Sequence, residues 1–493
     1  MINPYESLDR SEQRRRRRRN RKIIVALQLT AIVGIFAAGG IFIGSRLLHR
    51  GTPDPSAPVI AENSTGGAGT DGSGAGAAAG TDGAGDGVIA LDPESSAPQY
   101  DSPAGALLAQ ADRLAAGYDY DAAITLLQND ASYSSLPEVQ EAIAGYEATK
   151  ATLVRTPISE ITHVFFHSLI VDPSKAFDGD PDEGGYNQVM TTVSEFEKML
   201  QAFYDKGFVL VRLHDMAYET TDENGNPVMK AGDIMLPEGK TPFVMSQDDL
   251  CYYPYMDGDG FATRMIIGED GKPTCEMKLD DGSVSVGAYD LVPILEDFIQ
   301  EHPDFSYKGA RAVLAFTGYE GILGYRTSSA YADSPTYEQD RQEAAKVAQC
   351  LKDNGWELAS HSWGHLNLGT IEWDRFQTDT DKWENEVDSL IGPTDIILYP
   401  FGADIGDWRL YTTENERFNY LYAAGFRYFC NVDSNQYWVQ LGDTFLRQGR
   451  RNLDGYRMWK DISAEDPSHR KLDDLFRSED IFDPARPTPV PEM

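Results

Sequence analysis

Downstream of Thr156 the chain alternates between short apolar runs and longer stretches in which apolar residues recur at helical spacing. Runs such as THVFFHSLIV (162–171) are typical of buried strands, and stretches such as TVSEFEKMLQAFYDKG (192–207) are typical of amphipathic helices. The predicted strands are 162–171, 208–213, 241–249, 310–318, 356–360, 394–402 and 425–432, and the predicted helices are 192–207, 291–302, 343–355 and 415–424.

This alternation favours one fold class. Strands that alternate with helices of about 10 to 15 residues indicate βα units on a parallel sheet. Six or more such units over about 300 residues favour a closed (β/α) barrel over a small open sheet. We therefore expect an α/β fold, with a distorted (β/α) barrel domain over residues 156–475.

Residues 103–155 have a helical pattern of their own. Apolar residues recur at helical spacing from Ala104, the pattern breaks at 117–119, and another helix follows Pro137. The stretch GYDYDAAITLL (117–127) resembles the turn and second helix of a tetratricopeptide repeat. A single hairpin is below the three or so repeats that form a self-standing array. We expect a helical hairpin that packs on the barrel, and contact with another protein is the alternative.

The first hundred residues predict a membrane anchor and a tether. A basic segment, Arg14–Lys22, precedes 22 uncharged residues, 23–44, which as a helix span a hydrocarbon core of roughly 30 Å. The arginines should keep residues 1–22 in the cytoplasm, so that the rest of a single-pass protein of the cell membrane lies outside. A cleaved signal peptide is the alternative. Residues 45–102 are rich in Gly, Ala and Ser and predict a disordered linker, and residues 476–493 predict a disordered tail.

The charge and the cysteine content exclude some classes of partner and of metal site. The net charge is −35, and the N-terminal segment is basic, so everything downstream is more acidic still. Such a body repels nucleic acid, which we exclude as a partner. The four cysteines form no CxxC pair, so a thiolate zinc site is not expected. Cys251 and Cys275 form either a disulfide or two free thiols.

Polar side chains follow several of the predicted strands. His167, Asp248 and Asp249, His361 and His365, and Tyr399 all lie at strand ends. In a parallel α/β barrel the reactive residues gather at the C-terminal ends of the strands. This coincidence of polar strand ends predicts a functional site there.

Two of these groups suggest metal chemistry. A helical turn over 361–365 would project His361 and His365 from one face, so that both imidazoles reach one ion. Imidazole suits zinc, and a catalytic zinc site adds a carboxylate and keeps a position open for water. Two adjacent carboxylates, Asp248 and Asp249, repel each other unless a cation lies nearby. The alternatives are a chance histidine pair and an acidic loop in a chain that has 78 acidic residues.

The joint pattern resembles a known family. MSQDD (245–249), HSWGH (361–365) and YPFG (399–402) are similar to three motifs of the NodB-type polysaccharide deacetylases, carbohydrate esterase family 4. These are distorted (β/α) barrels that remove acetyl groups from sugars. The resemblance covers roughly residues 160–460. It implies that Asp248 is the general base and that Asp249, His361 and His365 bind a divalent metal, with zinc the favoured ion.

The sequence departs from the family pattern in two places. Leu398 stands where the third motif usually has an arginine, so the partner that tunes the base is missing or comes from elsewhere. The usual C-terminal Leu-x-His is absent, and Gln448 lies near that place. However, FFHSL (165–169) resembles the first strand of a permuted branch that includes exopolysaccharide deacetylases, in which this histidine is the acid. The resemblance then implies that His167 protonates the leaving amine; a hydrogen-bonded strand-end histidine is the alternative.

An insertion is expected at about 251–288. RMIIGEDGKPTCEMKL (264–279) predicts a β-hairpin that turns at Asp270 and Gly271. The aromatic segment before it either stacks on sugar rings or packs the insertion. Four aromatic residues are the candidates for substrate contact: Tyr253, Trp363, Tyr399 and Phe401.

These observations favour a metal-dependent hydrolase that deacetylates an N-acetylated cell-wall or extracellular polysaccharide. A divalent ion would polarise the acetyl group and bind the attacking water. The first alternative is a catalytically impaired glycan-binding protein on the same fold, suggested by Leu398 and by the missing Leu-x-His. The second is a scaffold in which the helical hairpin recruits a partner and the barrel is passive.

Overall fold

The structure is a computed structural model that describes residues 102–493. The predicted basic tail (1–22), the predicted membrane anchor (23–44) and all but the last residue of the predicted linker (45–102) lie outside the described residues. Within residues 102–493 no helix is both long enough and apolar enough to cross a membrane.

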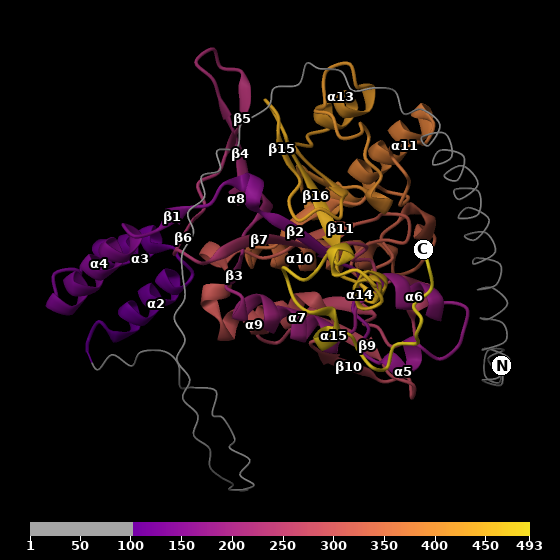
Figure 1. The fold of residues 1–493 in the computed structure, drawn as a ribbon, viewed down its shortest axis with the longest axis horizontal. Helices are drawn as coiled ribbons and strands as arrows, with labels where there is room; N and C mark the ends of the chain where they lie inside the picture. Colours follow the sequence, from indigo (N-terminus) through magenta and orange to yellow (C-terminus); the bar gives the residue numbers. More distant parts are fainter. Residues whose placement is uncertain (1–101) are drawn as a thin grey trace, which may run out of the picture. The chain divides into compact units, whose positions relative to one another are not determined.

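The centre of the described chain is a closed barrel of parallel strands (Figure 1). Each strand hydrogen-bonds the next in the order β2, β7, β11, β12, β13, β14 and β16, and β16 pairs with β2 to close the ring. Short β3 (Phe208–Leu210) pairs with the first residues of β7. The barrel strands are β2 (Thr162–Phe166), β7 (Thr241–Gln247), β11 (Val313–Phe316), β12 (Glu357–Ser360), β13 (Ile396–Leu398), β14 (Tyr428–Val432) and β16 (Leu446–Asn452). The predicted (β/α) barrel is confirmed.

Helices cover the outside of the barrel and hold most of the hydrophobic core against it. A capping box between Thr192 and Glu195 starts α7, whose apolar face packs beneath β3 and β7. The predicted helices are confirmed, with the bounds α7 (Val193–Asp205), α9 (Leu291–Glu301), α10 (Tyr337–Asp353) and α13 (Glu416–Ala423). Two further helices, α11 (Trp373–Trp383) and α14 (Gly455–Ile462), follow β12 and β16.

The insertion contains one strand more than predicted. It is a three-stranded antiparallel sheet of β8 (Arg264–Ile267), β9 (Pro273–Lys278) and β10 (Val284–Gly287). The expected hairpin is β8–β9, and β10 adds to the other edge of β9. A separate hairpin, β4 (Ala217–Thr221) with β5 (Pro227–Ala231), projects at the top of Figure 1.

The helical segment packs on the end of the barrel where the strands begin. It consists of α2 (Gly105–Ala116), α3 (Tyr120–Asn129) and α4 (Pro137–Lys150). The Tyr118 hydroxyl donates to the carbonyl of Asp304 at 2.9 Å, and the amide of Lys308 donates to the carbonyl of Gly117 at 2.7 Å. Apolar side chains of α2 and α3 belong to one core cluster with Val209 of β3 and Val244 of β7.

The prediction of a disordered tail at 476–493 is wrong. Residues Ser478–Ile481 form α15, and Val490 is buried. The guanidinium of Arg486 lies 2.6 Å from Glu195 of α7, and neither side chain is exposed. Arg486 also donates to the carbonyls of Asn187 and Met190. The tail is thus bound to the barrel domain by a buried ion pair and backbone contacts.

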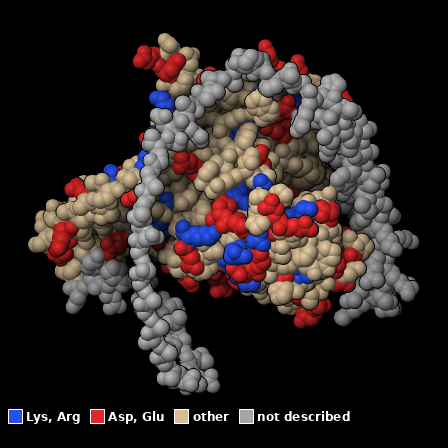
Figure 2. Space-filling model, viewed as in Figure 1, with Lys and Arg blue, Asp and Glu red and all other residues tan. Residues whose placement is uncertain are grey.

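Acidic side chains are prominent on the exterior of the described residues. Figure 2 shows them spread over the face in view, with a smaller group of basic side chains near its centre. A surface of this sign repels nucleic acid phosphates, and the exclusion of a nucleic acid partner stays a prediction.

Candidate functional site

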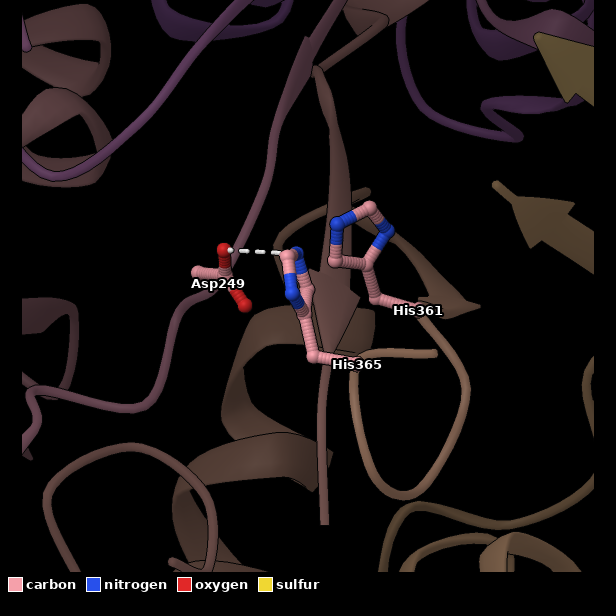
Figure 3. A group of neighbouring side chains, drawn as sticks. All are labelled: Asp249, His361 and His365. Atoms are coloured by element: carbon pink, nitrogen blue, oxygen red, sulfur yellow. Dashed lines mark ion pairs between the residues drawn. The ribbon is translucent and has the colours of Figure 1, made fainter. Parts of the chain in front are cut away.

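Three side chains from two strand ends converge at the mouth of the barrel. Asp249 follows β7, and His361 and His365 follow β12 (Figure 3). Each offers one ligand atom, and these atoms lie within 4.8 Å of one another. Nε2 of His365 is 3.5 Å from Oδ2 of Asp249, the pair joined by the dashed line in Figure 3. One carboxylate and two imidazoles form a donor set that fits zinc and leaves a coordination position open.

The two histidines do not meet through the helical turn that their spacing suggested. Residues 361–368 form no helix, and Ser362 and His365 have positive φ angles of 57° and 49°. The carboxylate of Asp379 accepts hydrogen bonds from the amides of Trp363 and Gly364, at 2.9 and 2.7 Å. This loop places residues in a backbone region that costs non-glycine residues about 1 kcal/mol or more, as is common at functional sites.

The orientation of His361 is set by the neighbouring strand. Its Nδ1 lies 2.7 Å from the carbonyl oxygen of Leu398, to which it donates. Nε2 is therefore left for a cation, and a backbone carbonyl is a usual partner for the second nitrogen of a metal-binding histidine. Burial lowers the pKa of His361 and outweighs the effect of Asp248 and Asp249. The neutral form, which a metal requires, is favoured.

Asp248 is held by an arginine that sequence reasoning missed. Oδ1 of Asp248 is 2.6 Å from a terminal nitrogen of Arg450 on β16, and Oδ2 is 3.8 Å from Nε2 of His361. Burial raises the pKa of Asp248, but Arg450 and His361 together outweigh it, and the pKa lies below its usual value. Arg450 on β16 is thus the charged partner of Asp248, whereas position 398, at the end of β13, is a leucine. The only sequence signal for it is a pair of arginines in FLRQGRRN (445–452).

Further polar groups inside the barrel support Arg450. The hydroxyl of Ser246 lies 3.3 Å from the same nitrogen, and Nε2 of His163 lies 2.9 Å from this hydroxyl. The other ring nitrogen of His163 is 3.1 Å from the side-chain oxygen of Gln448. Burial and the charge of Arg450 lower the pKa of His163 to about 3. His163 is therefore a neutral hydrogen-bonding group, and Gln448 is its partner.

His167 lies at the same mouth, directly after β2. Its Nδ1 is 3.0 Å from the carbonyl oxygen of Val189, which fixes the ring and leaves Nε2 for other partners. The charge of His167 contributes to the low pKa of both Asp248 and Asp249. His167 is half-buried.

The four aromatic candidates for substrate contact differ in exposure. Tyr399 and Tyr253 are buried, at 1% and 6% exposed, and the hydroxyl of Tyr399 lies 3.2 Å from that of Tyr411. Trp363 is half-buried beneath the ammonium of Lys382. Phe401 is 64% exposed, and its ring lies edge-on to His365 at 4.5 Å. Of the four, Phe401 presents the most open ring beside the histidines.

The four cysteines are free thiols. Cys251 lies in the loop after Asp249, and its sulfur is 2.9 Å from the hydroxyl of Thr317. Burial and the charge of Asp249 raise the pKa of Cys251 to about 12. The structure therefore contains no disulfide between Cys251 and Cys275.

No protein-family model and no curated protein matches the chain. Among solved structures, the chain is similar to the Streptococcus pyogenes deacetylase PplD in complex with acetate. The sequence identity is 12% and the TM-score is 0.32, and the match covers 61% of this chain and 93% of that one.

Proposed function

We propose that the chain is a metal-dependent hydrolase that removes acetyl groups from an N-acetylated polysaccharide. One observation carries the proposal: the ligand atoms of Asp249, His361 and His365 lie within 4.8 Å of one another. A second carboxylate, Asp248, adjoins this group at the same mouth. The order of these residues along the chain also agrees with the motifs of the NodB-type deacetylases.

Asp249, His361 and His365 would hold the cation. A bound zinc ion lowers the pKa of a bound water and polarises a carbonyl group. Nδ1 of His361 donates to the carbonyl of Leu398, so Nε2 is the ring nitrogen that can bind the ion.

Asp248 is the proposed general base. Arg450 binds one carboxylate oxygen, so the other is the oxygen that faces the histidines and takes a proton from the attacking water. The buried guanidinium also keeps Asp248 ionised, which a base must be before it accepts a proton.

His167 is the proposed general acid. Cleavage of an amide releases an amine, which needs a proton as the bond to carbon breaks. With Nδ1 bound to the carbonyl of Val189, Nε2 of His167 is the atom that can supply this proton.

The substrate class and the cellular location of the barrel are proposed from the sequence alone. An anchor at 23–44 and a linker at 45–102 would place the barrel outside the membrane, within reach of a cell-wall or extracellular polysaccharide. The alternative of an impaired glycan-binding protein was suggested by Leu398 and by the missing Leu-x-His. The guanidinium of Arg450, 2.6 Å from Oδ1 of Asp248, supports the catalytic alternative on the first of these points.

The test is release of acetate from an acetylated chitooligosaccharide by the zinc-loaded full chain. We expect Asp249→Ala to lose both zinc and activity, and Asp248→Asn to keep zinc while activity falls by about 10²-fold or more. Asp222→Asn, on the β4–β5 hairpin, is the control and should match the wild type. Acetate release by Asp249→Ala at the wild-type rate would refute the proposal.

A further inference from the structure

Tyr253 has a contact that its place in an aromatic segment does not suggest. Its hydroxyl donates to Oδ1 of Asp249 at 2.6 Å. Its ring stacks with those of Tyr255 and Tyr319, each with a centroid 5.4 Å away. Tyr253 is only 6% exposed, so almost none of its ring is open to a ligand. Tyr253 is therefore unable to stack on a sugar, and its polar end is directed at the carboxylate.

The direction of the hydrogen bonds follows from the chemistry of the groups. An ionised carboxylate only accepts, so the phenol proton of Tyr253 goes to Asp249. The phenol oxygen then accepts from the hydroxyl of Thr317, 2.7 Å away. The thiol of Cys251 lies 2.9 Å from the hydroxyl oxygen of Thr317 and 3.4 Å from its carbonyl oxygen, and both of these oxygens can accept its proton. Thr317 and Cys251 are fully buried, so this chain of donors points at Asp249 without competition from water.

The two oxygens of Asp249 thus face different partners. Oδ1 is bound by Tyr253, whereas Oδ2 is the oxygen that lies 3.5 Å from Nε2 of His365. Asp249 also has a positive φ of 58°, so its backbone is not that of a strand. The direction of its side chain therefore does not follow from strand geometry. A hydrogen bond at Oδ1 fixes the rotation of the carboxylate group and hence the direction of Oδ2.

We propose that Tyr253 is a positioning residue for the cation: its hydroxyl, itself oriented by Thr317, binds one oxygen of Asp249 so that the other is the single oxygen offered to the metal. This inference rests on the proposed metal site of Asp249, His361 and His365. It assigns a role to Tyr253, Thr317 and Cys251 that does not involve contact with substrate. Groups that orient a metal ligand in this way typically contribute 10- to 100-fold in metal affinity.

The test compares two neighbouring tyrosines. Tyr253→Phe keeps the stacked ring and removes the donor to Asp249. Tyr252→Phe is the matched control, because its buried hydroxyl donates to a different carboxylate, Asp290, at 2.8 Å. Zinc affinity of the full chain is measured by competition with a chromophoric chelator, and the visible spectrum of the cobalt-loaded chain reports the ligand geometry.

We expect Tyr253→Phe to weaken zinc binding about 10- to 100-fold and to change the cobalt spectrum, and Tyr252→Phe to do neither. Thr317→Val should weaken binding in the same direction by a smaller factor. Circular dichroism confirms that each variant is folded.

The possible failures are distinguishable. If the wild type binds zinc through Asp249 but Tyr253→Phe binds it within twofold of the wild type, the positioning role is overturned and the proposed function stands. If the wild type binds no zinc, or if Asp249→Ala binds it as tightly as the wild type, the metal site itself is refuted and the positioning role with it.

Discussion

Oδ1 of Asp248 lies 2.6 Å from a terminal nitrogen of Arg450, and both side chains are buried within the barrel. Two strands far apart in sequence supply this pair, β7 through its end and β16 through its interior. A buried carboxylate next to a candidate metal group stays ionised only with such a partner. The pair therefore links the integrity of the barrel to the chemistry at its mouth.

Removal of Arg450 should affect stability and activity together. Arg450→Met leaves Asp248 as an unpaired buried charge, and losing one partner of such a pair costs about 3–5 kcal/mol of unfolding free energy. Urea unfolding measures this cost. The double variant Asp248→Asn with Arg450→Met should recover part of the stability but no activity. Additive losses in the double variant would contradict a direct interaction.

The role of His167 can be tested by the leaving group of the substrate. His167→Gln should lower kcat on an N-acetylated sugar by about 10²- to 10⁴-fold, since the amine leaves only when protonated. An aryl acetate, whose phenolate leaves without a proton, should be hydrolysed nearly as fast as by the wild type. Zinc content should not change. Equal losses on both substrates would show that His167 is not the acid.

The C-terminal residues should contribute strongly to stability. Arg486→Met leaves Glu195 buried without its partner, and we expect a loss of about 3–5 kcal/mol in urea unfolding. Lys460→Met is the control: its partner Glu492 is exposed, and the loss should be far smaller than for Arg486→Met. Similar small losses in both variants would contradict a buried role for Arg486. Arg486 also binds residues on either side of Val189, the partner of His167.

Stability should depend on pH through His214, which joins α8 (Leu213–Met216) to β12 and to the residues before β13. Burial lowers its pKa, but hydrogen bonds with Asp395 and Glu357 outweigh this and raise it to about 10. Because the folded pKa exceeds the unfolded value of about 6.5, the stabilisation is complete below pH 6.5 and is lost as pH rises through 10.

His214→Gln isolates this contribution. The difference in unfolding free energy between wild type and variant should be largest near pH 6 and should shrink steadily toward pH 10. Thermal or urea unfolding at several pH values measures it. A difference that grows with pH would have the wrong sign for a raised pKa.

The barrel strands and the convergence of Asp249, His361 and His365 were predictable from the local sequence pattern. The apolar runs before His167, Asp248 and His361 are barrel strands, because a strand buried on both faces requires continuous apolar residues. The rule that reactive groups gather at the C-terminal ends of parallel strands then brought Asp249 together with the histidines.

What the sequence did not reveal depends on contacts between distant residues. The strand β16 carries Arg450 and Arg451, so no apolar run marks it, and each arginine is neutralised by a distant acid, Asp248 or Asp474. The tail was predicted as disordered, but Arg486 forms an ion pair with Glu195, nearly 300 residues earlier in the chain. Local pattern contains no information on such pairings.

The conformation of the loop that contains His361 and His365 was also not predictable from the local sequence pattern. Their spacing suggested a helical turn, whereas positive φ angles at Ser362 and His365 and the carboxylate of Asp379 bring the rings together. For the aromatic segment of Tyr253 the sequence left sugar stacking and packing of the insertion both open. In the structure the ring of Tyr253 stacks with Tyr255, two residues away, and with Tyr319, which follows β11.

X-ray absorption at the zinc edge of the purified full chain tests the common cation most directly. We expect scattering from two imidazole nitrogens and one carboxylate oxygen at about 2.0–2.2 Å, and loss of one imidazole in His361→Ala or His365→Ala. A zinc spectrum without histidine scattering, or one that neither substitution changes, would contradict the convergence of Asp249, His361 and His365 on one ion.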